Sequence, residues 1–238
     1  MKIGIVQPTN KESAISLTKK ALDSGASLIL LPEKWVQHLD EAPLEEFREL
    51  ARKYTAVIIP GAFEDGVSVV SPIIWTDGSI KGIAKKIHLF KSERGRLFSG
   101  DKAIIFTYGG IKFGIEICYD IDFPEVTRAL ALKGAEVILV PSKVKSEGIE
   151  IWREYLKVRV LENRISVLNA NALQPPEYPG MGVAIIPEKK NDLIIPKVVG
   201  ELANGKEDYM IVDIDPLLYL KIREDRLKEY VNFDVIEL

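Results

Sequence analysis

The stretch Ile111-Lys112-Phe113-Gly114-Ile115-Glu116-Ile117-Cys118-Tyr119-Asp120 decides the fold, because an apolar strand pattern runs directly into polar residues typical of a turn. A helical pattern follows over 123–133, and another apolar run covers 136–141. Strands that alternate with helices are typical of α/β folds. The stretch therefore predicts an α/β fold in which Cys118, the single cysteine of the chain, ends a buried strand.

The helix over 123–133 has a recognisable start signal. Asp122 precedes it, Pro124 lies in its first turn, and Glu125 follows Asp122 by three residues. This spacing predicts a capping box, in which the side chains of Asp122 and Glu125 satisfy the free N–H groups at the helix start.

The same alternation of strands and helices extends to both sides of this stretch, around a central block of hairpins. Asp65-Gly66, Asp77-Gly78 and Gly109-Gly110 are turn signals that join strands within the block. Hairpins make antiparallel neighbours, so we expect mixed sheets. Helices are predicted over 12–24, 43–54 and 149–163, and strands over 2–7, 27–31, 56–63, 67–75, 80–85, 103–107, 111–118, 165–171, 181–186, 193–199 and 209–214.

This number of strands predicts a four-layer α-β-β-α sandwich with two mixed β-sheets and helices on the outside. No linker, low-complexity segment or internal repeat divides the chain. We therefore expect a single domain over residues 1–238.

Composition excludes several classes of function. The chain has 238 residues, of which 47% are hydrophobic and 28% charged, and its formal net charge is −3. The sequence has no basic stripe interleaved with aromatic residues, so nucleic-acid binding is not expected. No apolar run is long enough to span a membrane. The N-terminus lacks the apolar core of a signal peptide, and one cysteine allows no internal disulfide. We expect a cytoplasmic protein.

The sequence predicts neither a metal site nor a cofactor. Its two histidines, His38 and His88, are fifty residues apart and have no cysteine nearby, so a zinc site is not expected. There is no Walker loop, and no Gly-x-Ser-x-Gly motif of the common serine hydrolases. We expect His88 to be structural rather than a general base.

Three chemically active residues share one position in the predicted fold. Glu33, Lys86 and Cys118 each lie at or just past the end of a predicted strand. Strand ends of α/β folds converge on one crevice, where a carboxylate, an ammonium and a thiol could serve as base, oxyanion partner and nucleophile. Each residue alone also has an ordinary interpretation: a solvated loop glutamate, a solvated basic edge, or a buried inert thiol.

The motifs around these residues resemble those of the carbon–nitrogen hydrolases, also called the nitrilase superfamily. Leu31-Pro32-Glu33, Lys85-Lys86-Ile87-His88-Leu89 and Gly114-Ile115-Glu116-Ile117-Cys118-Tyr119-Asp120-Ile121-Asp122-Phe123-Pro124-Glu125 are similar to three motifs of that family, in the same order. Glu93 is similar to a second glutamate that lines the family's site near the lysine. The resemblance covers about residues 2–226.

The resemblance implies a nitrilase-like fold and the hydrolysis of a small linear amide to an acid and ammonia. It implies that Glu33 takes the thiol proton of Cys118 and that Lys86 and the backbone N–H of Tyr119 hold the oxyanion. Glu93 then positions Lys86 or the substrate. A nitrile or N-carbamoyl substrate on the same site is an alternative, as is an inactive binding protein of this fold. Family members commonly pair, so a homodimer through the helices at 123–133 and 150–163 is expected.

One departure from the family pattern bears on the substrate. Members that act on small acidic amides often carry arginine at the position of Asp122, so this chain lacks a positive charge that could meet a substrate carboxylate. Lys143 follows the strand predicted to end at Pro141. Tyr119, Asp122 and Lys143 are therefore the candidates for substrate binding.

Overall fold

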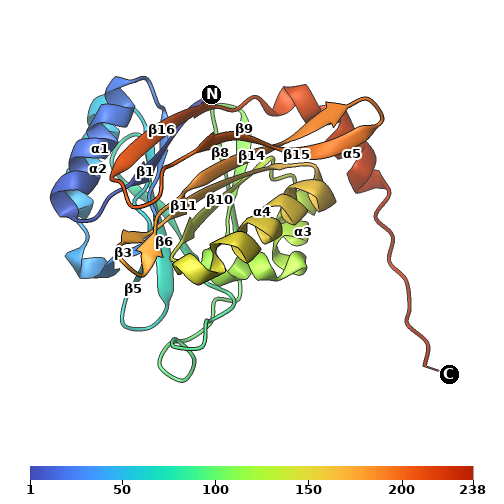
Figure 1. The fold of residues 1–238 in the computed structure, drawn as a ribbon, viewed down its shortest axis with the longest axis horizontal. Coiled ribbons are helices and arrows are strands. Elements are labelled where there is room, and N and C mark those ends of the chain that lie inside the picture. Colours follow the sequence, from blue (N-terminus) through green and yellow to red (C-terminus); the bar gives the residue numbers. More distant parts are fainter. Residues whose placement is uncertain (238) are drawn as a thin grey trace.

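The computed structural model describes residues 1–237, and its strands form two large sheets that pack face to face (Figure 1). The first sheet has eight strands. Seven follow one another across it, and the eighth, β7, pairs with β6. In spatial order they are β16 (Asp208–Asp213), β1 (Lys2–Gln7), β2 (Leu28–Leu30), β4 (Val57–Ile59), β6 (Val69–Ile74), β5 (Ala62–Glu64) and β3 (Glu33–His38), with β7 (Ile80–Lys85) beside β6.

The second sheet has six strands, and a short two-stranded ribbon, β12 (Leu173–Gln174) with β13 (Tyr178–Pro179), accompanies it. In spatial order its strands are β15 (Leu193–Glu201), β14 (Val183–Lys190), β11 (Ser166–Asn171), β10 (Val137–Ser142), β9 (Ile111–Ile115) and β8 (Ile104–Tyr108).

Both sheets are mixed, as the sequence predicts. The β1–β2–β4 and β9–β10–β11 neighbours are parallel. The hairpins at the three predicted glycine turns, β5–β6, β6–β7 and β8–β9, are antiparallel.

Helices cover the outer face of each sheet and complete the four layers. On one side α1 (Lys11–Asp23) and α2 (Leu44–Tyr54) pack on the first sheet, and on the other α3 (Pro124–Leu132) and α4 (Ile149–Asn163) pack on the second (Figure 1). A third cluster of buried apolar side chains lies between the sheets. The α-β-β-α sandwich is therefore confirmed. The remaining helices are α5 (Leu220–Lys228) and the 3-10 helices Leu39–Glu41, Cys118–Asp122, Ser146–Gly148 and Pro216–Tyr219.

The predicted strand over 56–63 is wrong in one respect, because it is two strands, β4 and β5. They are separated at Gly61, whose φ is +117°. A Cβ there would lie 2.2 Å from the Pro32 carbonyl oxygen, so only glycine allows the chain to pass this close to the Glu33 segment. That segment itself pairs with β5 as β3, a strand that the sequence did not indicate.

The predicted capping box at α3 is also wrong. The N-cap of α3 is Phe123, and no side chain caps the helix. Asp122 instead ends the preceding 3-10 helix, η2 (Cys118–Asp122), while Pro124 occupies the first turn of α3, where a missing N–H costs nothing. The carboxylate of Asp122 is thereby left to face elsewhere.

The part of the chain that the structure describes has neither a helix suited to cross a membrane nor a cluster of metal-binding side chains. None of the helices within residues 1–237 combines the length and the apolar character needed to cross a membrane. Within the same residues, no three His, Cys, Asp or Glu side chains gather in a way that could hold a metal ion.

Candidate active site

Strand direction brings the predicted site residues to one edge of the sandwich. β6 is antiparallel to both β4 and β7, so β7 runs in the same direction as β4 and its parallel neighbour β2. Glu33 after β2 and Lys86 after β7 therefore lie at the same edge of the first sheet. Cys118 and Lys143 follow β9 and β10, which are parallel neighbours in the second sheet. The site therefore forms between the two sheets.

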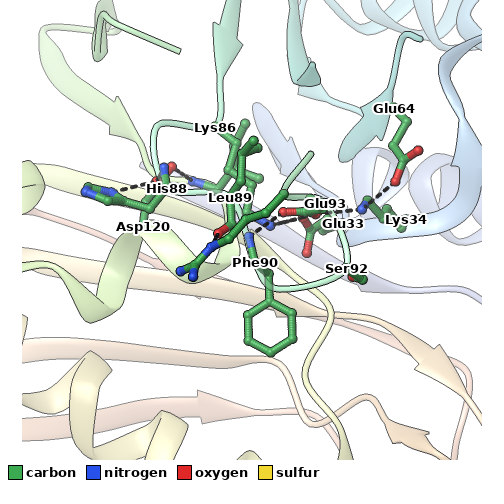
Figure 2. Close-up of polar contacts among 12 residues, drawn as sticks. Glu33, Lys34, Glu64, Lys86, His88, Leu89, Phe90, Ser92, Glu93 and Asp120 are labelled. Atoms are coloured by element: carbon green, nitrogen blue, oxygen red, sulfur yellow. Dashed lines mark hydrogen bonds and ion pairs between the residues drawn. The ribbon is translucent and has the colours of Figure 1, made fainter. Parts of the chain in front are cut away.

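Lys86 lies between two carboxylates. Its Nζ is 2.8 Å from Glu33 Oε1 and 3.0 Å from Glu93 Oε1, and its side chain is only 1% exposed (Figure 2). Burial alone lowers the pKa of Lys86, but the negative charges of Glu33 and Glu93 outweigh it and raise the pKa well above the ordinary value. Lys86 is therefore a fixed positive charge at neutral pH.

A second lysine extends this group of charges. Lys34 Nζ is 2.6 Å from Glu93 Oε1 and 2.9 Å from Glu64 Oε1 (Figure 2). The other oxygen of Glu93, Oε2, accepts the Phe90 N–H at 2.7 Å, so its carboxylate is fixed at both ends. Burial opposes ionisation of Glu93, yet Lys86 and Lys34 hold its pKa below the usual range. We call Glu33, Lys34, Glu64, Lys86 and Glu93 the charge cluster.

Arg96 closes the charge cluster on the solvent side. Its guanidinium donates to both oxygens of Glu64, at 3.0 and 3.1 Å, and together with Lys34 it lowers the pKa of Glu64 to about 2. Sequence reasoning missed Lys34, Glu64 and Arg96. A signal existed for two of them, because Glu64 is a charged residue at the end of a strand and Lys34 directly follows Glu33.

Cys118 occupies a strained turn just past β9, which ends at Ile115 and not at Cys118 as the sequence predicts. It is the first residue of η2 and has a φ of +47°, in the left-handed region that non-glycine residues rarely adopt. Its residue as a whole is partly exposed. Burial of the sulfur and the nearby Glu33 carboxylate raise the pKa of the thiol, against the opposing effect of Lys86. The resting thiol is therefore protonated.

Asp120 joins the lysine segment to the cysteine turn. Its Oδ1 accepts the N–H of His88 at 2.7 Å (Figure 2). Oδ1 also accepts the N–H of Ile87 at 3.1 Å, and Oδ2 accepts the N–H of Ile117 at 3.1 Å. Asp120 is 2% exposed, and sequence reasoning missed it although it stands within the cysteine motif. His88 stacks on Phe123 with the ring centroids 3.6 Å apart and donates to or accepts from Asp120, which fits the predicted structural role.

All seven residues predicted for the site line one pocket of about 760 Å³. Lys143, on the wall of the second sheet, has its Nζ 3.4 Å from the Lys34 carbonyl oxygen and 4.7 Å from the centre of the Tyr178 ring. The pocket wall also contains several aromatic rings. The predicted residues are Glu33, Lys86, Glu93, Cys118, Tyr119, Asp122 and Lys143.

Comparison with known proteins gives three kinds of match. The family model described as carbon-nitrogen hydrolase matches residues 6–191. A protein named nitrilase from Pyrococcus abyssi is 29% identical over 94% of this chain and 90% of its own. The crystal structure of Saccharomyces cerevisiae Nit3, a member of branch 10 of the nitrilase superfamily, has a TM-score of 0.81 at 22% identity and covers 94% of this chain and 93% of its own.

An amidase from Nesterenkonia sp. AN1 has a similar fold. A mutant of it has a TM-score of 0.72 at 21% identity and covers 96% of this chain and 95% of its own. That structure shows covalent addition of the acetamide moiety of fluoroacetamide at the amidase's active-site cysteine. At these identities the two structural matches show a shared fold.

Proposed function

The chain belongs to the carbon–nitrogen hydrolase family, and on this premise we propose that it cleaves a small linear amide to an acid and ammonia through a thioester at Cys118. The observation that carries the proposal is the contact of Lys86 with Glu33 and Glu93, at 2.8 and 3.0 Å, in the pocket that Cys118 lines. A proton acceptor, a fixed positive charge and a sulfur nucleophile are the parts that acyl transfer requires.

In the proposed reaction Glu33 accepts the proton of the Cys118 thiol while the sulfur attacks the carbonyl carbon of the amide. The raised pKa of the thiol is the reason why this acceptor is needed. The developing oxyanion is held by the Lys86 ammonium and the backbone N–H of Tyr119. Each such donor typically lowers a barrier by roughly 3–4 kcal/mol.

The second half of the proposed reaction uses the same groups. Glu33 passes its proton to the leaving nitrogen, so that ammonia departs and the acyl group stays on the sulfur. Glu33 then takes a proton from water, the resulting hydroxide attacks the thioester, and the acid leaves as the thiol is restored. Glu93 holds Lys86 in place, because its carboxylate is itself fixed by Lys34 and by the Phe90 N–H.

The experiment is a panel of small amides, nitriles and N-carbamoyl compounds assayed by ammonia release. We expect at least one amide to be hydrolysed by the wild type and none by Cys118→Ala. Full turnover by Cys118→Ala would contradict the mechanism. Turnover of nitriles or N-carbamoyl compounds, but of no amide, would change the proposed substrate class and leave the proposed site residues unchanged.

Alkylation of Cys118 separates an active enzyme from an inactive binding protein of the same fold. Although the resting thiol is protonated, we expect iodoacetamide to label Cys118 faster than the thiol of a denatured control peptide, because Glu33 accepts the thiol proton as the sulfur attacks; Glu33→Gln should lose this advantage. Labelling no faster than the peptide would favour the binding protein. The complete set of contacts among Glu33, Lys86 and Glu93 argues for the enzyme.

We further propose that the chain, as one domain, is cytoplasmic and forms a homodimer through α3 and α4. Ile151 and Val158 lie two turns apart on α4 and are 65% and 39% exposed, and Leu132 at the end of α3 is 44% exposed. These apolar side chains support the pairing surface. Light scattering should show a dimer at micromolar concentration, and Val158→Glu should weaken it; a wild-type monomer would contradict the proposal.

A further inference from the structure

Asp122 stands on the pocket wall on a rigid piece of backbone. It is the last residue of η2, four residues after Cys118. The buried guanidinium of Arg159, on α4, donates to the Ile121 carbonyl at 2.8 Å and to the Asp122 carbonyl at 2.9 Å. The position of Asp122 relative to Cys118 is therefore fixed by the fold.

The carboxylate of Asp122 lacks a partner within residues 1–237. Arg159 directs its three donating nitrogens to the two carbonyls and to Glu162 Oε2, at 2.9 Å, and no hydrogen bond reaches the Asp122 carboxylate from any described residue. The side chain is half-buried, and burial raises its pKa to about 6 despite the nearby Arg159. A half-buried charge without a partner is unfavourable.

The other acidic side chains deep in the pocket are all satisfied. Glu33, Glu64 and Glu93 each contact a lysine within 3.0 Å. The remaining one, Glu147, is exposed at the rim. Asp122 is therefore the half-buried acid of the pocket wall that has no partner among the described residues and is free to bind a ligand.

Aromatic side chains accompany Asp122. Trp152 and Tyr155 line the pocket, and they precede Arg159 on α4 by about two turns and one turn, so the three share one face of the helix. Tyr119, one residue after the nucleophile, lines it too. A carboxylate among aromatic faces is a typical environment for an organic ammonium group.

Lys143 is held beside the charge cluster. Its Nζ is 3.4 Å from the carbonyl oxygen of Lys34, a member of that cluster. Lys143 therefore belongs to the end of the pocket where the charge cluster lies. In a substrate that reaches from Cys118 to Asp122, a cationic group bound at Asp122 would lie at a distance from the scissile bond.

We propose that Asp122 recognises an ammonium group on the acyl side of the substrate, so that the enzyme prefers amides of amino-terminated chains to neutral or anionic amides. The inference rests on the proposed function, since it names the substrate class of the same site. Because Asp122 does not cap α3, its carboxylate is free for this binding role.

The kinetic test uses three amides of equal chain length: 5-aminopentanamide, pentanamide and glutaramate. We expect the wild type to favour 5-aminopentanamide over pentanamide by roughly tenfold or more in kcat/KM, mainly through KM, and to use glutaramate least. Asp122→Asn, which keeps the shape and removes the charge, should reduce the ratio for the first two amides roughly tenfold. Glu147→Gln removes an exposed rim carboxylate and should leave that ratio within about twofold.

A binding test does not depend on turnover. We expect pentylammonium to protect Cys118 from iodoacetamide at lower concentration than pentanoate, and Asp122→Asn to abolish the difference. Turnover without discrimination by charge, or a ratio that survives in Asp122→Asn, overturns the role of Asp122 and leaves the amidase proposal intact. Selective protection without ammonia release from any amide supports Asp122 and overturns the proposed reaction instead.

Discussion

The two ends of the pocket differ in whether their charged side chains have partners. In the charge cluster every carboxylate and every ammonium has a partner at 3.0 Å or less, whereas the carboxylate of Asp122 has none among the described residues. Paired buried charges hold one another in a fixed geometry and protonation state. An unpaired charge on a rigid wall is free to select a ligand. In the proposed function, this comparison separates the residues that carry out the chemistry from the one that we propose selects the substrate.

Replacing Lys86, the central cation of the charge cluster, is expected to have the largest effect on activity and stability. Lys86→Met leaves Glu33 and Glu93 buried without their shared partner, so we expect kcat/KM to fall by roughly 10²–10³ or more and the free energy of unfolding by about 3–5 kcal/mol. Amide kinetics and urea denaturation measure these effects. The neighbouring exposed Lys85 provides the control, and equal losses in Lys85→Met and Lys86→Met would contradict the account.

A third kind of carboxyl group sharpens the comparison, because Glu116 is fully buried and forms no ion pair with any residue that the structure describes, although Arg159 is near enough to lower its pKa slightly. It accepts one hydrogen bond, from Thr127 Oγ1 at 3.0 Å, and burial raises its pKa to about 8. Its folded pKa exceeds the unfolded value near 4.5, so its contribution to stability is present at low pH and is lost as the pH rises towards 8.

We therefore expect the stability of Glu116→Gln relative to the wild type to increase by roughly 3–4 kcal/mol from pH 5 to pH 8. Urea unfolding of both proteins across this range measures the difference. A difference that stays constant with pH would show that Glu116 is ionised in the folded protein.

Asp120 tests whether the charge cluster depends on the hydrogen bonds that join the Lys86 segment to the cysteine turn. Asp120→Ala leaves the N–H groups of Ile87, His88 and Ile117 without their acceptor and frees the Lys86 segment from the cysteine turn. We expect a loss of about 2–3 kcal/mol of stability and a fall of roughly tenfold or more in kcat. Thermal unfolding and kinetics provide the measurements, and unchanged kcat with lowered stability would restrict Asp120 to folding.

The smallest effect is expected at the solvent edge of the charge cluster. Arg96 holds Glu64 but is itself exposed, and Lys34 still contacts Glu64 when Arg96 is removed. Arg96→Gln should change kcat/KM by no more than about twofold. A loss as large as that of Lys86→Met would show that the pairing extends functionally to the surface.

The sequence predicted the parts of this arrangement that depend on periodicity and on motifs. Apolar runs and glycine turns gave the layers, and strand ends located Glu33, Lys86 and Cys118. The break at Gly61 was not visible, because it depends on the approach of the Pro32 carbonyl from another segment. The partners Lys34, Glu64 and Arg96 were missed for the same reason, since their contacts join residues far apart in the chain.

Asp122 shows how a local pattern can be misleading. Asp122 and Glu125 have the spacing of a capping box, yet η2 continues through Asp122 and α3 begins only at Pro124. The contacts that fix this register come from Arg159 on α4, which no local pattern reveals. The departure of Asp122 from the family pattern was visible in the sequence, whereas its lack of a partner required the structure.

The most direct test of the central claim is the identity of the residue that carries the acyl group during turnover. Wild-type enzyme mixed with an amide that it hydrolyses is quenched in acid within the first turnovers, and its peptides are analysed by mass spectrometry. The account predicts an increase equal to the acyl group on the peptide that contains Cys118, lost on treatment with hydroxylamine. An acyl group on any other residue, or turnover by Cys118→Ala at the wild-type rate, would contradict it.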